Sequence, residues 1–196
     1  MEVNKRVTRI EKNSILHTEI ETTIDIVSCL SSESAEKVEY VFLNDSFFSQ
    51  QLDDQVLDKT KNKKDRESRV YVCIKIEDEH NTYLIPLRSE VPIHDRNLKK
   101  TFYHVPSTKR PNAGLDFRKI VIVNDPSLYR VEEAQISHKQ KKMIHENFNE
   151  IKKLAFNYIK GFKKSAKKNR HKRDYEYSFS SLSNFLNELG VQTKDC

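Results

Sequence analysis

The sequence predicts an α+β fold: a mainly antiparallel sheet of five or six strands with two C-terminal helices packed against it. Two observations predict this class. Between residues 38 and 123, short apolar runs of strand length are separated by polar turns, and residues 70–76 alternate between two faces. From Ser137 onward, the apolar residues recur with the helical period of about 3.6 residues instead.

The first strand is expected at residues 38–42. Asp45 or Ser46 can then cap a short helix, because side-chain oxygens of these types accept a hydrogen bond from an unpaired backbone N–H of the first turn. Apolar residues in this short helix are Phe47, Phe48 and Leu52. A charged loop is expected over residues 57–68.

A β-hairpin follows the charged loop. Residues 69–76 form its first strand, residues 77–82 its turn and residues 83–87 its return strand. Pro86 lies within the return strand. Because proline has no N–H for the ladder, it predicts an edge strand or the end of pairing at this point.

Two further strands are expected at residues 98–105 and 117–123. A turn-rich loop over residues 106–114 separates them. The pair Asp125-Pro126 ends the second of these strands.

The C-terminal part reads as two helices. Ser137 is a suitable cap for the first, whose apolar stripe comprises Met143, Ile144, Phe148, Ile151, Leu154, Ala155, Tyr158, Ile159 and Phe162. A basic stretch from Lys160 to Arg173 follows. The last helix is expected to turn Phe179, Leu182, Phe185, Leu186 and Leu189 inward and to stop at Gly190.

The chain of 196 residues is long enough for one ordinary domain with a short appendage. Residues 1–37 are interpreted as an N-terminal extension of unknown role, residues 38–190 as the domain and residues 191–196 as a tail. The N-terminal residues are charged and have no apolar centre, so a secretory signal is not expected. No run approaches the roughly 20 apolar residues of a membrane helix.

The net charge of +6 and the isoelectric point near 9.1 favour an anionic partner, with nucleic acid first and a membrane surface second. A merely soluble basic protein is the alternative. Only three glycines are present, which argues against a phosphate-binding glycine loop. The three cysteines form no CxxC pair, so neither a zinc site nor a disulfide framework is expected, and reduced thiols in the cytoplasm are the natural interpretation.

The return strand of the hairpin carries a motif, Pro86-Leu87-Arg88-Ser89, followed by His94. It resembles the toxins of type III toxin–antitoxin and phage abortive-infection systems, the ToxN/AbiQ family. ToxN-like members end this strand in Pro-Leu-Thr-Ser-Pro-Lys with a histidine shortly after it. TenpN-like members have Pro-Leu-Arg-Ser, which is closer to this sequence.

Three other segments resemble the same family in the same order along the chain. They are the strand that begins Gly114-Leu115-Asp116-Phe117, the long helix from Ser137, and the closing segment from Tyr177 to Gly190. The resemblance therefore covers about residues 38–190, and residues 1–37 have no counterpart in it.

The resemblance implies a fold and an activity. The implied fold is a strongly twisted antiparallel sheet with helices, similar to the MazF/Kid ribonuclease toxins. The implied activity is endonucleolytic cleavage of single-stranded RNA without a metal or cofactor, by attack of the 2′-hydroxyl, which leaves a 2′,3′-cyclic phosphate and a 5′-hydroxyl. The implied partner is a repeated antitoxin RNA whose pseudoknots join toxin copies in a closed assembly, in the cytoplasm and away from membranes.

Such cleavage needs a proton acceptor, a proton donor and a group that stabilises the charged phosphorane. Ser89 stands where the family has its serine and can donate a hydrogen bond to a phosphate oxygen; the alternative is a serine that begins a turn. Arg88 can bind phosphate through two nitrogens, or can be a solvated arginine. His94 can act as general acid or base, or can be a surface histidine.

One position departs from the family pattern: Val91 stands where ToxN-like members have a lysine. Residues that can supply this charge instead are Arg88, Lys99, Lys100 and Arg69, with Arg66 competing with Arg69 for the family's basic position. A catalytically inactive RNA-binding protein on the same fold is therefore the second hypothesis. A structural protein with a basic surface is the third.

Further residues are expected to contact RNA or to support the site. Phe102 and Tyr103 can stack on unpaired bases, His104 is a weaker candidate, and Asp116 is interpreted as structural, bonding the turn at Gly114. The basic run after residue 160 can bind RNA or can be a solvated linker. Expected phosphate partners are Lys109, Arg110, Arg118, Lys163, Lys164, Lys167 and Lys168, beside Arg69, Lys99 and Lys100.

Overall fold

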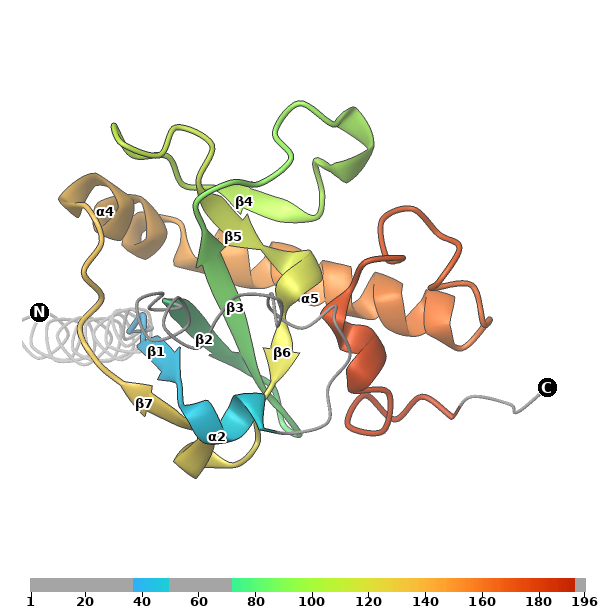
Figure 1. The fold of residues 1–196 in the computed structure, drawn as a ribbon. Helices are drawn as coiled ribbons and strands as arrows, with labels where there is room; N and C mark the ends of the chain where they lie inside the picture. Colours follow the sequence, from blue (N-terminus) through green and yellow to red (C-terminus); the bar gives the residue numbers. More distant parts are fainter. Residues whose placement is uncertain (1–36, 50–71, 193–196) are drawn as a thin grey trace, which may run out of the picture. The chain divides into compact units, whose positions relative to one another are not determined.

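The computed structural model describes residues 37–49 and 72–192, and the strands in these residues form one open sheet. Every pairing is antiparallel, in the order β4-β5-β3-β2-β1-β7, with β6 pairing on β3 beside β5. Figure 1 shows β3 running through the middle of this arrangement. The seven strands are β1 Tyr40–Leu43, β2 Cys73–Glu77, β3 Thr82–Arg88, β4 Phe102–His104, β5 Gly114–Asp116, β6 Val121–Ile122 and β7 Tyr129–Val131.

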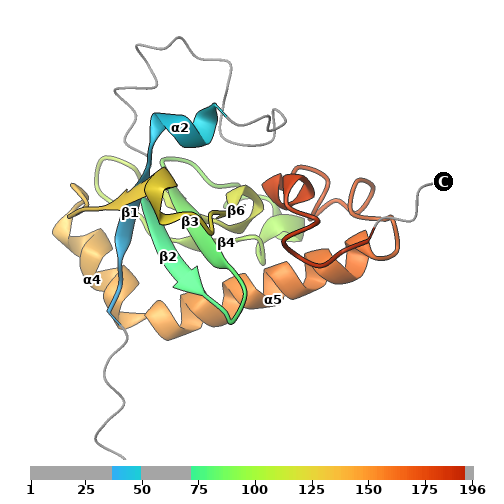
Figure 2. The same ribbon diagram turned by 90° about the horizontal axis from the view of Figure 1, so that it is seen from below.

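Two helices, α4 (His138–Glu146) and α5 (Phe148–Ala166), follow the sheet in the chain. Figure 2 shows α5 passing along one side of the strands. The buried stripe of α5 packs with the strands in a single core, whose members include Ile74, Leu84, Ile85, Leu115, Val121, Ile151, Ala155, Ile159 and Phe162. Cys73 is fully buried in this core, and burial raises the pKa of its thiol to about 12.

The predicted hairpin is present as β2 and β3, paired from Cys73↔Pro86 to Glu77↔Thr82. Its turn is fixed by Asp78, whose carboxylate accepts hydrogen bonds from the backbone N–H groups of His80 and Asn81. The same carboxylate accepts a hydrogen bond from the Tyr83 hydroxyl at 2.8 Å. These contacts lower the pKa of Asp78, against the desolvation that opposes them.

The prediction that Pro86 marks an edge strand is wrong. β3 pairs with β2 along one side and with both β6 and β5 along the other. Successive N–H groups of a strand point to opposite sides, and the N–H of Leu87 donates to Val72 on the β2 side. The backbone nitrogen of Pro86, which has no hydrogen, therefore faces the other side of β3. There it lies between the pairing of Leu84 with β6 and that of Leu87 with β5, where no ladder bond is needed.

Three turns of 3-10 helix lie within or beside the segments predicted as strands 98–105 and 117–123. They are η1 (Arg96–Leu98), η2 (Phe117–Lys119) and η3 (Pro126–Leu128). Each is preceded by an aspartate whose carboxylate accepts the N–H two residues ahead: Asp95, Asp116 and Asp125. The predicted strands 98–105 and 117–123 are reduced to β4 and β6. The break predicted at Asp125-Pro126 is present as η3, and it is followed directly by β7, a strand that was not predicted.

The first strand begins two residues later than predicted, and a short helix, α2 (Asp45–Phe48), follows it. The cap position belongs to Asn44, so the assignment to Asp45 or Ser46 is wrong. Asn44 makes no side-chain cap; its amide donates instead to the carbonyl of Ser127 at 2.8 Å. Leu52, the charged loop, residues 69–71, the N-terminal extension up to residue 36 and residues 193–196 lie outside the described residues.

Ser137 caps the first C-terminal helix as predicted. Its hydroxyl accepts the N–H of Gln140, and the Gln140 side chain reaches back to the Ser137 N–H, which is a complete capping box. The predicted stripe is one face of two helices, because the chain breaks at Asn147. The Asn147 amide donates to the Met143 carbonyl at 2.8 Å, a side-chain bond that competes with regular helix.

The predicted closing helix is wrong: within the described residues the closing segment holds only the 3-10 turn η4 (Ser181–Asn184). Ser181 donates to the carbonyl of Ile120 at 2.5 Å, and Ser180 accepts the N–H of Leu182. These bonds fix the backbone outside an α-helix. Leu182, Phe185 and Leu189 are buried as predicted, Leu186 packs partly against the core and Gly190 has a φ of 63°, but Phe179 is 57% exposed.

Gly114 is the point of closest approach between β5 and its surroundings. A Cβ atom at this residue would lie 2.6 Å from the carbonyl oxygen of Tyr103 and 2.9 Å from a methyl group of Val91. Only a residue without a side chain lets β4 and the segment after β3 close on β5 here.

We expect Gly114→Ala to lower the free energy of unfolding by roughly 1–3 kcal/mol, because the added methyl group meets backbone that cannot move aside. Urea denaturation of both proteins measures the difference. Gly190→Ala is the control, since nothing lies within 4 Å of its Cβ position and only the positive φ opposes it. Equal stability of wild type and Gly114→Ala would contradict the close approach.

Candidate functional site

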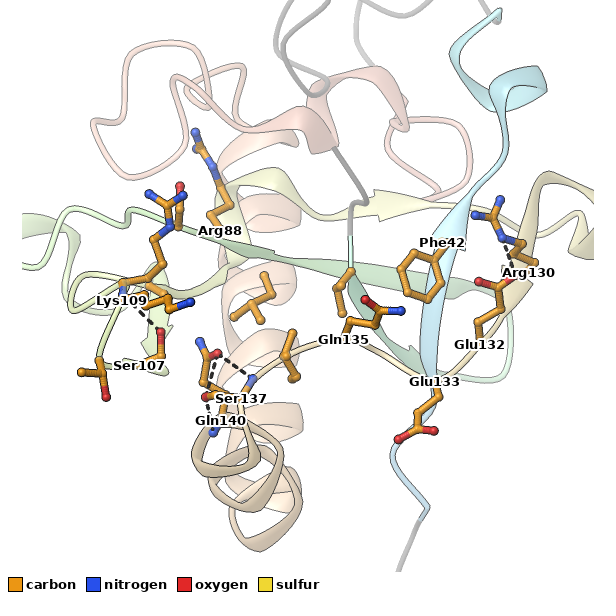
Figure 3. A pocket seen from close by; sticks show the side chains of 17 residues that line it. Phe42, Arg88, Ser107, Lys109, Arg130, Glu132, Glu133, Gln135, Ser137 and Gln140 are labelled. Carbon is orange, nitrogen blue, oxygen red and sulfur yellow. Dashed lines mark hydrogen bonds and ion pairs between the residues drawn. The ribbon is translucent and has the colours of Figure 1, made fainter. Parts of the chain in front are cut away.

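Arg88 and Ser89 lie where β3 leaves the sheet. Burial decreases along this strand, from Tyr83 to Pro86 in the core to a half-buried Arg88 and an exposed Ser89. The end of a central strand is a rigid position, so the two side chains are presented to solvent from a fixed backbone. Figure 3 shows Arg88 at one end of a pocket.

Asp116 anchors Arg88. The β3–β5 register pairs Arg88 with Gly114, which puts Asp116 diagonally across from Arg88 and within reach of its long side chain. The Arg88 Nη1 donates to the Asp116 carboxylate at 3.2 Å. Asp116 has no solvent exposure, whereas the Arg88 side chain is 41% exposed. The sequence interpretation of Asp116 as a structural residue missed this anchoring role.

Arg118 is held by the same carboxylate. Its Nε and Nη2 donate to the two oxygens of Asp116 at 3.1 and 3.0 Å, and its side chain is only 15% exposed. Two arginines therefore share one aspartate, which leaves the cluster with a net positive charge. Arg118 uses its fork on Asp116, while Arg88 uses one nitrogen and keeps the others for a ligand, so Arg88 is the better phosphate-binding group of the two.

The pocket at this end of β3 has a volume of about 960 Å³. Four of the predicted residues line it together, Arg88, Ser89, Lys109 and Arg110. Its apolar floor consists of Val72, Leu87, Ala113 and Ile136, and its far end holds Phe42, Arg130 and Glu132 (Figure 3).

The acidic side chains of the pocket are neutralised by neighbours. Glu132 accepts a hydrogen bond from Arg130 at 2.7 Å, and Glu133 accepts one from Lys141 at 2.6 Å. The cations at the β3 end therefore define the charge that a ligand meets. The sequence reasoning missed Arg130 and Gln135 as pocket residues, because only the β1–β7 pairing and the start of α4 bring them to β3.

The structure gives a physical reason for the valine at position 91. Val91 is buried, its methyl groups lie against Gly114, and its N–H donates to the carbonyl of Asn112. This position packs the sheet in this chain and cannot present a charge. Of the residues expected to replace the family lysine, Arg88 lines the pocket, Lys99 and Lys100 do not, and Arg69 and Arg66 lie outside the described residues.

His94 lies in the turn between β3 and η1, where it is exposed and does not line the pocket. Lys99 and Lys100 are exposed just beyond η1. Among the other candidates, Tyr103 packs against the core, Phe102 is half-buried, and His104 contacts the carbonyl of Pro111 through its Nε2 at 2.8 Å.

The four predicted lysines of α5 and its end form a separate site. Lys163, Lys164, Lys167 and Lys168 line a shallow pocket of about 600 Å³ with Lys160, Phe156 and the Asp78 turn. It shares no lining residue with the pocket of Arg88 and Ser89. The two pockets thus hold only part of the residues expected to bind RNA: Arg118 bonds to Asp116, and Lys99 and Lys100 line neither pocket.

Residues 37–49 and 72–192 contain neither a cluster of metal ligands nor a membrane-spanning helix. No group of three or more histidine, cysteine, aspartate or glutamate side chains there could hold a metal ion. None of the described helices is both long and apolar enough to cross a membrane.

No protein-family profile matches the chain, and no curated protein matches it by sequence. A solved chain does resemble it, from work described as "A processed non-coding RNA regulates a bacterial antiviral system". The two chains are 11% identical with a TM-score of 0.51, and the match covers 76% of this chain and 98% of that one. Likeness at this identity shows a shared fold, and it agrees with the predicted α+β class of an antiparallel sheet with C-terminal helices.

We expect Asp116→Asn to lower the free energy of unfolding by roughly 2–4 kcal/mol, because it leaves two arginines without their buried counter-charge. Chemical denaturation measures the loss. Asp125→Asn is the matched control: Asp125 caps η3 as Asp116 caps η2, but it is exposed and carries no arginine. A loss no greater than that of the control would mean that Asp116 is only a turn cap.

Proposed function

We propose that this chain is the endoribonuclease toxin of a type III toxin–antitoxin or abortive-infection system, with residues 38–190 as its ribonuclease domain. The observation that carries the proposal is Arg88, held by buried Asp116 beside exposed Ser89, at the mouth of a pocket with Lys109 and Arg110. The shared fold with a chain from an RNA-regulated antiviral system supports it. So does the motif at residues 86–89.

The pocket suits a nucleotide of single-stranded RNA. Its cations meet phosphate, and its apolar floor of Val72, Leu87, Ala113 and Ile136 suits the face of a base. In the proposed reaction the 2′-hydroxyl attacks the adjacent phosphorus, the bond to the 5′-oxygen breaks, and the products carry a 2′,3′-cyclic phosphate and a 5′-hydroxyl. No metal or cofactor is required in this scheme.

Each proposed residue has one task. Arg88 binds the phosphorane oxygens through the nitrogens that Asp116 leaves available, and Ser89 donates its hydroxyl to one of them. Lys109 and Arg110 supply the charge that the family lysine would give. His94 is the proposed general base or general acid. It takes the proton of the attacking 2′-hydroxyl or gives a proton to the leaving 5′-oxygen.

The proposed partners are substrate RNA and a repeated antitoxin RNA that joins toxin copies in a closed assembly in the cytoplasm. Lys163, Lys164, Lys167 and Lys168 form a second cationic surface for the RNA backbone. One observation favours the alternative of an inactive RNA-binding protein: the family lysine is replaced by Val91, which is buried.

Expression from an inducible promoter is expected to arrest growth and to create new RNA ends with 5′-hydroxyls. Ser89→Ala and Arg88→Ala are each expected to lower cleavage about 100- to 1,000-fold, because each removes a donor to the transition state. His94→Ala tests the proposed general base or general acid. Sequencing of 5′-hydroxyl ends together with growth curves gives the readout.

Lys153→Ala is the control, since Lys153 is an exposed cation of α5 that lines neither pocket. It is expected to retain toxicity and the same ends. Soluble wild-type protein that causes neither arrest nor new ends contradicts the nuclease and favours the RNA-binding alternative. Growth arrest that survives Arg88→Ala, Ser89→Ala and His94→Ala would mean that the active site lies elsewhere.

Purified protein is expected to cleave RNA equally well after dialysis against EDTA, because the proposed chemistry uses only side chains. Product gels with and without added Mg²⁺ or Mn²⁺ measure this. Restoration of activity by a divalent ion after its loss in EDTA would contradict a metal-independent mechanism.

A further inference from the structure

Two aromatic side chains of the C-terminal segment are exposed, and the sequence predicted burial for one of them, Phe179. Tyr175 is 55% exposed and Phe179 is 57% exposed. They lie four residues apart in one loop, whereas Leu182 and Phe185 of the next turn are buried. We call Tyr175 and Phe179 the aromatic platform.

The loop that carries the platform is held in place by hydrogen bonds. Asp174 accepts bonds from the Ser165 hydroxyl at 2.6 Å and from Arg170, and its carbonyl accepts the N–H groups of Tyr177 and Ser178. These contacts tie the loop to α5. Rings presented on a fixed backbone lose little conformational entropy when a ligand covers them.

The loop that carries the platform bonds to Asp95, which precedes η1, and to η2, the turn directly after Asp116. The Tyr175 hydroxyl donates to the carboxylate of Asp95 at 2.7 Å, and Lys119 donates to the carbonyl of Phe179 at 3.3 Å. The bond to Asp95 raises the pKa of Tyr175. The loop is therefore joined to the turn of His94 and Asp95 through the Tyr175 side chain, and to η2 through the backbone of Phe179.

The charges around the platform are mainly positive. Arg118 and Lys119 lie on η2, and Lys172 and Arg173 precede Tyr175 as exposed cations. Asp95 and Asp174 are both engaged in hydrogen bonds, which leaves Glu176 as the remaining acidic side chain of the loop. Exposed rings with cations nearby fit a ligand that combines anionic groups with flat apolar faces, which is the chemistry of an unpaired polynucleotide.

We propose that Tyr175 and Phe179 form a stacking site for unpaired bases of single-stranded RNA, adjoining the arginines on Asp116. This rests on the proposed function for its choice of RNA. A duplex is excluded because its bases are covered by their neighbours. The strand would pass from the pocket of Arg88 across Arg118 to the platform, so the platform selects unpaired RNA.

The chain contains no tryptophan, so Phe179→Trp introduces a single fluorescent reporter at the platform. We expect single-stranded RNA of about 12 nucleotides to quench this tryptophan, since a stacked base contacts the indole directly. The same strand annealed to its complement should leave it unquenched. The Ser89→Ala background prevents cleavage during the titration.

Val131→Trp is the matched control. Val131 is 58% exposed, and it alternates with Arg130 and Glu132, so it points away from the pocket that they line. Its fluorescence is expected to stay constant while the RNA binds. Quenching at both positions, or at neither while binding is retained, overturns the stacking site.

The affinity for single-stranded RNA distinguishes the role of the Tyr175 ring from that of its hydroxyl. Tyr175→Ala and Phe179→Ala are each expected to weaken single-strand binding roughly 5- to 100-fold. Tyr175→Phe keeps the ring and loses only the bond to Asp95, so its affinity should stay within about two-fold. If Tyr175→Phe weakens binding as much as Tyr175→Ala, the residue positions the Asp95 turn and does not stack.

The outcomes for the two proposals are distinct. Quenching by single-stranded RNA, together with absence of cleavage by the protein that retains Ser89, supports the platform and contradicts the nuclease. RNA cleavage without quenching of the tryptophan at Phe179→Trp supports the nuclease and contradicts the platform. If Phe179→Ala dissociates a dimer in sedimentation and leaves RNA affinity unchanged, the platform is a protein interface, and the stacking site is overturned.

Discussion

Asp116 carries a charge with no exposure to solvent, and such a carboxylate is stable only when its charge and its lone pairs are both matched. Two guanidiniums and the N–H of Arg118 provide this match. The end of β3, the end of β5 and the turn η2 are therefore fixed against one another by a single electrostatic requirement. That requirement also decides where Arg88 stands, so the stability of the sheet and the geometry of the candidate site depend on the same contact.

The central position of β3 explains how the rest of the site is assembled. This strand is paired on both sides, and Pro86 tolerates the arrangement because its missing N–H falls between β6 and β5. Arg88 and Ser89 thus emerge from the most supported backbone of the sheet. Lys109 and Arg110 come from a loop 21 and 22 residues further along, and the pairing of β4 with β5 returns that loop to the end of β3.

The elements that depend on a local periodicity of apolar residues could be predicted from the sequence. The hairpin alternation and the helical stripe from Ser137 were visible in the sequence, and so was the capping box residue itself. The missed closing segment depends on a bond between distant segments. Ser181 donates to the carbonyl of Ile120, 61 residues away, and this bond keeps the closing segment out of an α-helix. Within the site, the motif pointed to Arg88 and Ser89, and Lys109 and Arg110 were expected as phosphate partners. The anchoring by Asp116 follows from the register of β3 on β5, which residue types alone do not encode.

Gln140 connects two walls of the pocket that come from segments far apart in the sequence. Its amide nitrogen donates to the carbonyl of Val105 at 2.8 Å, while its oxygen accepts from Ser137 at the start of α4. The loop with Lys109 and Arg110 begins directly after Val105, so α4 and this loop are mechanically linked. The break at Asn147 separates α4 from α5, which is anchored along its length in the core. The width of the pocket on this side therefore depends on the position of α4, which is itself held in the core by Ile144.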